Sequence, residues 1–244
     1  MTIQTRTLSY TDSQGVTLKS HLCLPKQAVD GLSGVLVAPE WWGLSEHVKR
    51  SAERLAEAGY AALAIDLYGD ALLTDKADVA NQNMTYLLEH PEILNERTDL
   101  ALTQLQNLPE VAQINVGAVG FCFGGKVVLD MARRGLPLKA VTSFHGILTP
   151  AVPALEGMVK GEILVQHGEA DTLTTMDDVA AFRKEMDDAK VVYHIDVFPG
   201  VKHGFTNPQA TENGEKNHVD FLDYNAEAAE TSWRNMLGFL ERHL

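Results

Sequence analysis

The stretch Gly117–Val128, which reads GAVGFCFGGKVV, decides the fold that we predict for this chain. A short apolar run, Val116–Phe121, leads into Cys122, and a segment of helical character follows over Gly124–Arg134. This order of strand, tight turn and helix is typical of a nucleophile elbow, which needs small residues two positions before and two positions after the nucleophile. Glycines occupy both positions. A buried structural thiol between two glycines is the alternative interpretation, and the motif alone leaves both open.

Strand-length apolar runs alternate with segments of helical period along the rest of the chain. This alternation predicts an α/β fold with a mainly parallel, doubly wound central sheet, helices on both faces and an N-terminal antiparallel hairpin, in one domain over residues 1–244. The polar segment TENGEKNHVD, residues 211–220, is predicted to be a solvated loop. The predicted strands are Thr5–Tyr10, Gly15–Cys23, Gly34–Ala38, Tyr60–Leu67, Val116–Phe121, Leu138–Phe144, Ile163–His167 and Val191–Val197. The other predicted helices run from Ser45 to Gly59 and over Ala77–His90, Ile93–Leu108, Val179–Ala189 and Ala226–His243.

Composition excludes several functional classes. A net charge of −13 and a pI of about 5.0 disfavour nucleic acid as a partner. No apolar run approaches the ~20 residues that span a bilayer, and the N-terminus lacks a signal-peptide core, so we expect a cytoplasmic protein without a membrane partner. Two cysteines are too few for a disulfide framework, and no metal-binding motif occurs, so neither a metal nor a cofactor is predicted.

Polar side chains follow two later strands of the predicted sheet. Asp171 follows Ile163–His167 in HGEAD, and His203 follows Val191–Val197 in PGVKHGF. Because ligands of such sheets bind beyond the carboxyl ends of the strands, we expect both side chains to lie near Cys122. The chain order of nucleophile, acid and base is that of α/β-hydrolases, with Asp171 orienting the imidazole and His203 exchanging protons. Each residue taken singly could instead be an ordinary loop residue.

The loop after Gly34–Ala38 carries a further carboxylate, in APEWWG. In this fold that loop supplies one oxyanion-hole donor, which makes the backbone N–H of Trp41 a candidate beside the N–H of Phe123 at the start of the elbow helix. Glu40 would then lie near the nucleophile, and packing under the tryptophans would raise its pKa so that it acts as a local base. A salt bridge or a helix-start carboxylate is the alternative for Glu40, and a pocket wall is the expectation for Trp42.

These segments together resemble the dienelactone hydrolase family, the cysteine-nucleophile branch of the α/β-hydrolases. The resemblance rests on APEWWG, AIDLYG, VGFCFGG, SFHG, LVQHGEAD and VKHGF, and it covers nearly the whole chain. It implies a triad of Cys122, Asp171 and His203 and an α/β-hydrolase fold. It also implies that Glu40 pairs with the resting thiol and takes its proton when substrate binds, after which the thiolate turns toward His203 and attacks.

The chain departs from the family where substrate is held. Members that cleave dienelactone bind its carboxylate with two arginines, one of them four residues after the catalytic histidine, where this chain has Asn207. The segment between Arg54 and Arg97 contains a single lysine or arginine, Lys76, so the second arginine is also missing. Asparagine cannot replace a bidentate guanidinium. Dienelactone itself is therefore not the expected substrate. The candidate pocket residues are Trp42, Tyr68, Phe121, Phe205 and Asn207.

The sequence therefore predicts a hydrolase that cleaves a small carbon ester or lactone through an acyl group on Cys122. A thioester or peptide cysteine hydrolase on the same scaffold is one alternative, because the triad would serve any acyl transfer. A non-enzymatic redox or ligand sensor is another, because a thiol at a helix N-terminus oxidises readily. The oligomeric state stays open.

Overall fold

A computed structural model describes residues 2–26 and 31–244, and the chain divides into two compact units, Met1–Ala118 and Val119–Leu244. Eight strands in the described residues follow the order β1-β2-β4-β3-β5-β6-β7-β8, and β5 crosses the division. The strands are β1 (Ile3–Thr11), β2 (Thr17–Pro25), β3 (Leu32–Ala38), β4 (Ala61–Ala64), β5 (Val111–Phe121), β6 (Ala140–Phe144), β7 (Glu162–Gly168) and β8 (Tyr193–Phe198). The helices are α1 (Glu46–Glu57), α2 (Ala77–Glu89), α3 (Pro91–Gln106), α4 (Phe123–Arg133), α5 (Met176–Asp188), α6 (Ala210–Asn217) and α7 (Ala226–His243).

The first unit begins with the predicted hairpin. Strands β1 and β2 pair antiparallel, and their turn is closed by the Asp12 carboxylate, which accepts the backbone N–H groups of Gln14 and Val16. Strand β2 then pairs antiparallel with β4, which pairs parallel with β3. Helix α1 starts where the sequence predicts, because the Ser45 hydroxyl accepts the N–H of Val48 as an N-cap.

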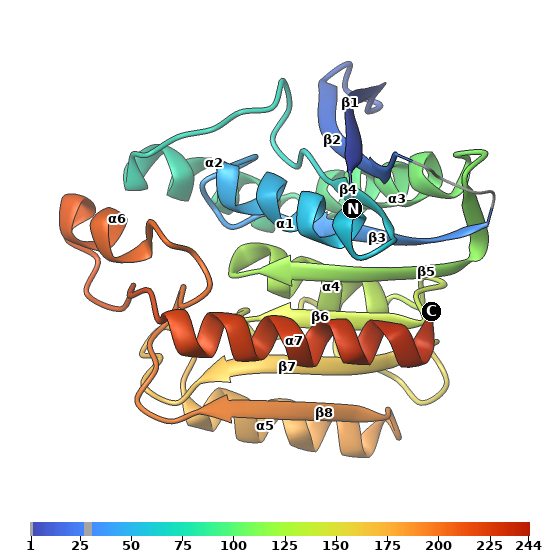
Figure 1. The fold of residues 1–244 in the computed structure, drawn as a ribbon. Coiled ribbons are helices and arrows are strands. Elements are labelled where there is room, and N and C mark those ends of the chain that lie inside the picture. The colour runs from blue at the N-terminus through green and yellow to red at the C-terminus, as the bar shows by residue number, and fades with distance from the viewer. Residues whose placement is uncertain (1, 27–30) are drawn as a thin grey trace. The chain divides into compact units, whose positions relative to one another are not determined.

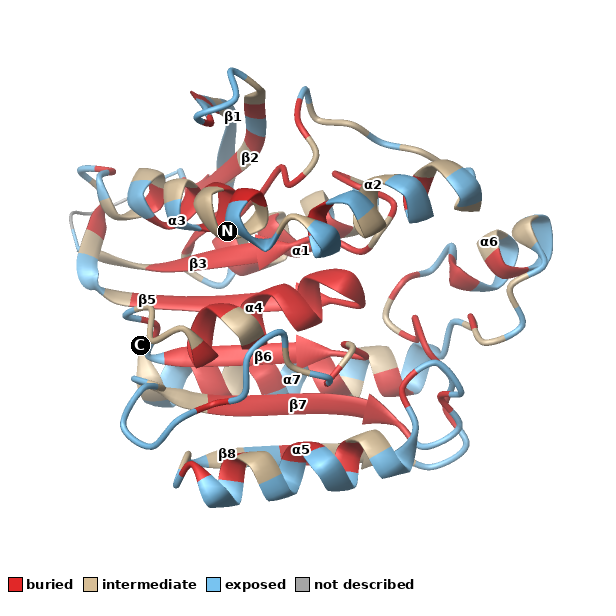
Figure 2. Cartoon of the chain, turned by 180° about the vertical axis from the view of Figure 1, so that it is seen from behind, coloured by how far each residue is buried: buried red, intermediate tan, exposed pale blue. Residues whose placement is uncertain are grey.

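The second unit holds the parallel strands β6, β7 and β8 in register. Helix α7 crosses one face of β6 and β7, while α4 and α5 lie on the other side (Figure 1). Strands β6 and β7 are buried along nearly their whole length (Figure 2). A strand buried on both faces reads as a continuous apolar run, which is why the sequence identifies these strands. The predicted α/β fold with its leading hairpin is therefore confirmed.

One prediction in the second unit is wrong. The polar segment 211–220 is not a loop: helix α6 covers most of it and ends at His218 in a left-handed conformation with φ of 55°. Its buried positions are the small residues Ala210 and Gly214, four apart on one helix face. A Cβ at Gly214 would lie 2.9 Å from the carbonyl oxygen of Val219, so close backbone contact rather than apolar side chains holds this helix. A search for apolar periodicity cannot detect it.

Candidate active site

Cys122 lies in the tight turn between β5 and α4, as the elbow motif predicts. Its backbone has φ of 53° and ψ of −116°, a conformation that non-glycine residues rarely adopt. The N–H of Cys122 donates to the carbonyl oxygen of Phe144 (3.0 Å), and its own carbonyl oxygen accepts the N–H of Gly125 (2.9 Å). The residue is 7% exposed. These bonds at both sides of the residue hold the strained turn, and such strain is characteristic of functional sites.

Glycines are required on both sides of this turn because the backbone passes so closely. A Cβ at Gly120 would lie 2.0 Å from the carbonyl oxygen of Gly124. A Cβ at Gly125 would lie 2.6 Å from the hydroxyl of Ser143 and 2.7 Å from the Cα of Gly146. The elbow therefore packs directly against the end of β6, and no larger residue fits at either position.

Asp171 and His203 form a fully buried hydrogen-bonded pair. Nδ1 of His203 lies 2.7 Å from Oδ2 of Asp171, and both side chains have 0% exposure. The other carboxylate oxygen accepts the N–H groups of Leu173 (2.8 Å) and Thr174 (3.0 Å), which fix the carboxylate in the loop after β7. An acid held in this way can orient an imidazole and stabilise its charged form.

The electrostatics of His203 depend on Cys122 as well as on Asp171. Burial of the ring opposes protonation, but the charges of Cys122 and Asp171 outweigh it and raise the pKa of His203 to about 10. Cys122 favours the protonated ring both through its charge and through side-chain hydrogen bonding. An imidazolium facing a thiolate is the arrangement that activates a cysteine nucleophile.

Comparisons with known proteins show the family of this chain. The model of the "Dienelactone hydrolase family" matches residues 18–244. The chain belongs to the dienelactone hydrolase family. It is therefore a hydrolase of the class that cleaves lactones and esters, and the α/β-hydrolase fold that the sequence predicts is confirmed.

The relatives carry related names. A Synechocystis protein named "Putative carboxymethylenebutenolidase" is 28% identical over 100% of both chains. A Bradyrhizobium protein named "Probable 2-oxo-3-(5-oxofuran-2-ylidene)propanoate lactonase" is 28% identical over 91% of this chain and 88% of its own length. The crystal structure of a dienelactone hydrolase-like promiscuous phosphotriesterase from metagenomic libraries superposes with a TM-score of 0.92 at 31% identity, covering 100% of this chain and 99% of that one.

The first unit of this dienelactone hydrolase family member holds four of the predicted residues. Glu40 and Trp42 are buried, and the carbonyl oxygen of Glu40 accepts the N–H of Gly43 (3.2 Å). The hydroxyl of Tyr68 donates to the carbonyl oxygen of Trp41 (3.0 Å), and the two indole rings lie 4.8 Å apart. Tyr68 thus joins the segment after β4 to the loop after β3, which carries the two tryptophans. The pairing of Glu40 with Cys122 stays a prediction.

The remaining candidate pocket residues belong to the second unit, where each has a packing role. Phe121 stacks on Phe144 with ring centroids 4.9 Å apart. Phe205 is fully buried in a small apolar cluster of Val201, Phe198 and Ala228. The side-chain oxygen of Asn207 accepts the N–H of Gln209 (2.9 Å), which shapes the turn before α6.

Arg97 is the first arginine after the segment in which the family's second clamp arginine would lie, and its side chain is already engaged. Its Nη2 and Nε each lie 2.9 Å from the buried Asp12 carboxylate. Its Nη1 donates to the carbonyl oxygens of Leu67 (2.6 Å) and Tyr68 (3.2 Å). The guanidinium therefore joins the hairpin turn to the segment after β4 and is not available to a substrate. Sequence reasoning missed this pair, because its partners are far apart in the chain.

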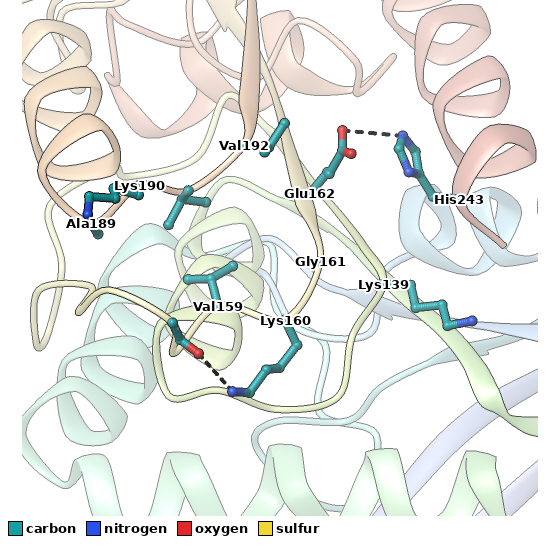
Figure 3. A pocket seen from close by; sticks show the side chains of 11 residues that line it. Lys139, Val159, Lys160, Gly161, Glu162, Ala189, Lys190, Val192 and His243 are labelled. Carbon is teal, nitrogen blue, oxygen red and sulfur yellow. Dashed lines mark hydrogen bonds and ion pairs between the residues drawn. The ribbon is translucent and has the colours of Figure 1, made fainter.

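A separate pocket of about 470 Å³ lies at the amino ends of β6, β7 and β8 (Figure 3). None of the predicted catalytic residues lines it, since all of them follow the carboxyl ends of the strands. Its charged groups have partners: Oε2 of Glu162 lies 3.5 Å from Nε2 of His243, and Nζ of Lys160 donates to the carbonyl oxygen of Gly157 (2.8 Å). This pocket therefore shares no residue with the proposed catalytic set. Within residues 2–26 and 31–244, no cluster of metal-ligating side chains and no helix able to cross a bilayer occurs.

Proposed function

We propose that this hydrolase cleaves a small carbon ester or lactone through an acyl-enzyme on Cys122. The thiolate sulfur attacks the carbonyl carbon, and the carbonyl oxygen becomes an oxyanion. The C–O bond to the leaving group then breaks, and the alkoxide takes a proton from the His203 imidazolium. A water molecule next gives its proton to His203 and attacks the thioester carbon. The C–S bond breaks, and the acid leaves.

Several residues would assist these steps. Asp171 would hold the imidazole and stabilise its charge, as its 2.7 Å contact with Nδ1 supports. The backbone N–H groups of Phe123 and Trp41 would stabilise the oxyanion, with the first placed at the N-terminus of α4, where the helix dipole favours negative charge. Glu40 would take the proton of the resting thiol when substrate binds.

The observation that carries this proposal is the buried Asp171–His203 pair together with the strained elbow at Cys122. Hydrolysis of p-nitrophenyl acetate tests it. We expect Cys122→Ala to lose turnover by a factor of about 10³ or more, since a nucleophile that acts as one unit with its base cannot be replaced. Equal rates for Cys122→Ala and the unchanged enzyme would rule the proposal out.

Two companion variants sharpen the test. Cys122→Ser separates the need for a thiol from the need for any nucleophile. Cys23→Ala is the matched thiol control, because Cys23 lies buried in β2, where burial raises the pKa of its thiol to about 12 and keeps it inert. We expect Cys23→Ala to retain the hydrolysis rate.

A second candidate substrate class is the neutral phosphotriester. A structure with a TM-score of 0.92 to this chain carries the name of a promiscuous phosphotriesterase. The engagement of Arg97 with Asp12 and the turn role of Asn207 favour substrates without a carboxylate. A panel of one aryl ester, one lactone and one dialkyl aryl phosphate would rank the classes by kcat/KM. We expect the carbon ester first, and loss of all three activities in Cys122→Ala.

The alternative functions make different predictions on the same protein. A thioester or peptide hydrolase would prefer acyl-thioesters or peptides over p-nitrophenyl acetate, whereas a redox sensor would form no acyl group on Cys122 that turns over. Intact-mass analysis during turnover separates these outcomes. A single domain over residues 1–244 and a cytoplasmic location remain our predictions.

A further inference from the structure

His145 is a buried residue that the mechanism above does not use. It directly follows β6, has 0% exposure, and adopts φ of 37°. This left-handed conformation is unfavourable for a residue with a Cβ, and glycine would adopt it without strain. Gly146 is the next residue, so the chain keeps an imidazole at a strained position with a glycine directly beside it. Strain that a fold retains indicates a role for the side chain.

The His145 ring contacts the loop that carries the proposed base. Nε2 of His145 lies 2.7 Å from the hydroxyl oxygen of Thr206. The ring packs edge-on against His203, with centroids 5.1 Å apart, and against Phe205, with centroids 5.2 Å apart. Three of the four residues in 203–206 thus touch this one side chain.

The backbone around His145 also connects to the other two members of the proposed triad. The carbonyl oxygen of Phe144 accepts the N–H of Cys122 (3.0 Å). The N–H of His145 donates to the carbonyl oxygen of Gln166 in β7 (2.8 Å), the strand that leads to Asp171. His145 therefore lies at the point where the nucleophile, the base and the strand before the acid meet.

We propose that His145 is a positioning residue that holds the His203 ring in its reactive orientation, with Thr206 fixing the His145 ring. This inference rests on the proposed role of His203. The bond to Asp171 fixes Nδ1 of His203, and the orientation of the rest of the ring depends on the side chains packed around it. Edge contact from His145 and the 2.7 Å bond to Thr206 restrict that motion.

The test uses substitutions at both ends of the His145–Thr206 bond. Thr206→Val removes the hydroxyl at nearly constant shape, and Thr206→Ser keeps it as the matched control. His145→Phe keeps a planar ring but removes Nε2, although Phe adopts positive φ less readily. His145→Asn tolerates the left-handed backbone and removes the ring, so it separates loss of folding from loss of the contact.

Two readouts distinguish positioning from a merely structural role. The first is kcat and KM for p-nitrophenyl acetate. The second is the pH dependence of Cys122 alkylation by iodoacetamide, followed by intact mass, which reports the pairing of Cys122 with His203. The titratable groups that bear on the His203 ring are Asp171, Cys122, His145 and His167. The free energy of unfolding is measured alongside.

We expect Thr206→Val and His145→Phe each to lower kcat by about tenfold with little change in KM, because misplacement of a reacting group by a fraction of an ångström slows the chemical step. Thr206→Ser keeps the unchanged enzyme's kcat. The effects of Thr206→Val and His145→Phe do not add in the double variant. The inference is overturned if Thr206→Val keeps both kcat and the alkylation profile, or if Thr206→Ser loses as much as Thr206→Val.

The outcome is separable from that of the proposed function. If Cys122→Ala keeps its esterase activity, the proposed function fails on that result alone. The alkylation profile still reports whether His145 and Thr206 hold His203 near Cys122, because it requires no ester substrate.

Discussion

The His203 imidazole is buried between an acid and a thiol, and this position makes its charge depend on the fold. Burial alone would lower the pKa, yet Cys122 and Asp171 raise it to about 10. The protonated ring therefore contributes to the unfolding free energy. That contribution is fully present below the unfolded pKa of about 6.5 and is lost as the pH rises through about 10. The protonation of His203 therefore affects both the unfolding free energy and the proposed proton transfer beside Cys122.

Replacement of the thiol tests this linkage. Cys122→Ala removes the group that raises the pKa of His203 most, so the pKa falls and the pH window in which the ring stabilises the fold becomes narrower. We expect the unfolding free energy of the unchanged protein to decline from neutral pH toward about pH 10 more steeply than that of Cys122→Ala. Urea unfolding across this range measures both. Parallel pH profiles would show that the thiol does not set the charge of His203.

The places of site residues in the fold were predictable from sequence where they follow from position along the chain. Cys122, Asp171 and His203 each come within a few residues of the end of an apolar run, and the parallel sheet brings such positions to one edge. Arg97 and Asp12 were not predictable as a pair, because no local pattern records an ion pair between a helix and a distant hairpin turn. The contacts of His145 with Thr206 and His203 likewise exist only after the strand and the loop have packed.

At the scale of elements, the junction of β5 and α4 depends on the absence of side chains. Gly120→Ala would place a Cβ 2.0 Å from a backbone oxygen in the first turn of α4, so the turn must shift. We expect it to destabilise the protein by about 3 kcal/mol or more. Gly238→Ala is the control, because its Cβ meets nothing closer than 3.6 Å inside α7 and helix propensity favours alanine by about 1 kcal/mol. Denaturant unfolding of both variants measures the difference between their unfolding free energies. Equal unfolding free energies would mean that the elbow is flexible enough to accept a Cβ at Gly120.

Helices α4 and α5 are joined by a charge network that is nearly buried. Nη2 of Arg133 lies 2.8 Å from Oε2 of Glu185, and Arg133 also contacts Asp130 and the carbonyl oxygen of Leu148. Glu185→Gln removes one of the two carboxylates that face this buried guanidinium and leaves Asp130, and we expect a loss of about 2 kcal/mol in unfolding free energy. Lys184→Gln is the control, because it breaks an exposed ion pair with Asp188 on the same helix. We expect it to change the unfolding free energy by less than about 1 kcal/mol. Equal losses would mean that burial does not strengthen the Arg133 network.

Elements with an apolar face were predictable, and elements held by close backbone contact were not. The start of α1 followed from Ser45, and the buried strands followed from their apolar runs. Helix α6 was missed because its buried face consists of Ala210 and Gly214. Strand β5 begins at Val111, earlier than predicted, because its first half alternates polar and apolar residues and lies partly exposed.

The whole molecule carries a net charge of −13, and this charge bears on which esters it can use. A negative field lowers the local concentration of anionic substrates at low ionic strength, and salt screens it. Arg97, the first arginine after the segment in which the family's second clamp arginine would lie, is bound to Asp12 and does not offset the repulsion for a carboxylate-bearing ester. Neutral and anionic esters of similar size should therefore differ in how their hydrolysis responds to salt.

A pair of matched substrates tests this difference: p-nitrophenyl acetate, which is neutral, and mono-p-nitrophenyl succinate, which carries a carboxylate. We expect kcat/KM for the anionic ester to rise on the order of twofold or more with added salt, because screening weakens repulsion by the negative field, while kcat/KM for the neutral ester stays constant. Rates of Cys122→Ala under the same conditions give the background to subtract. If the anionic ester is the better substrate at low salt and is weakened by added salt, a cationic group holds its carboxylate. The substrate of this family member would then be an anion after all.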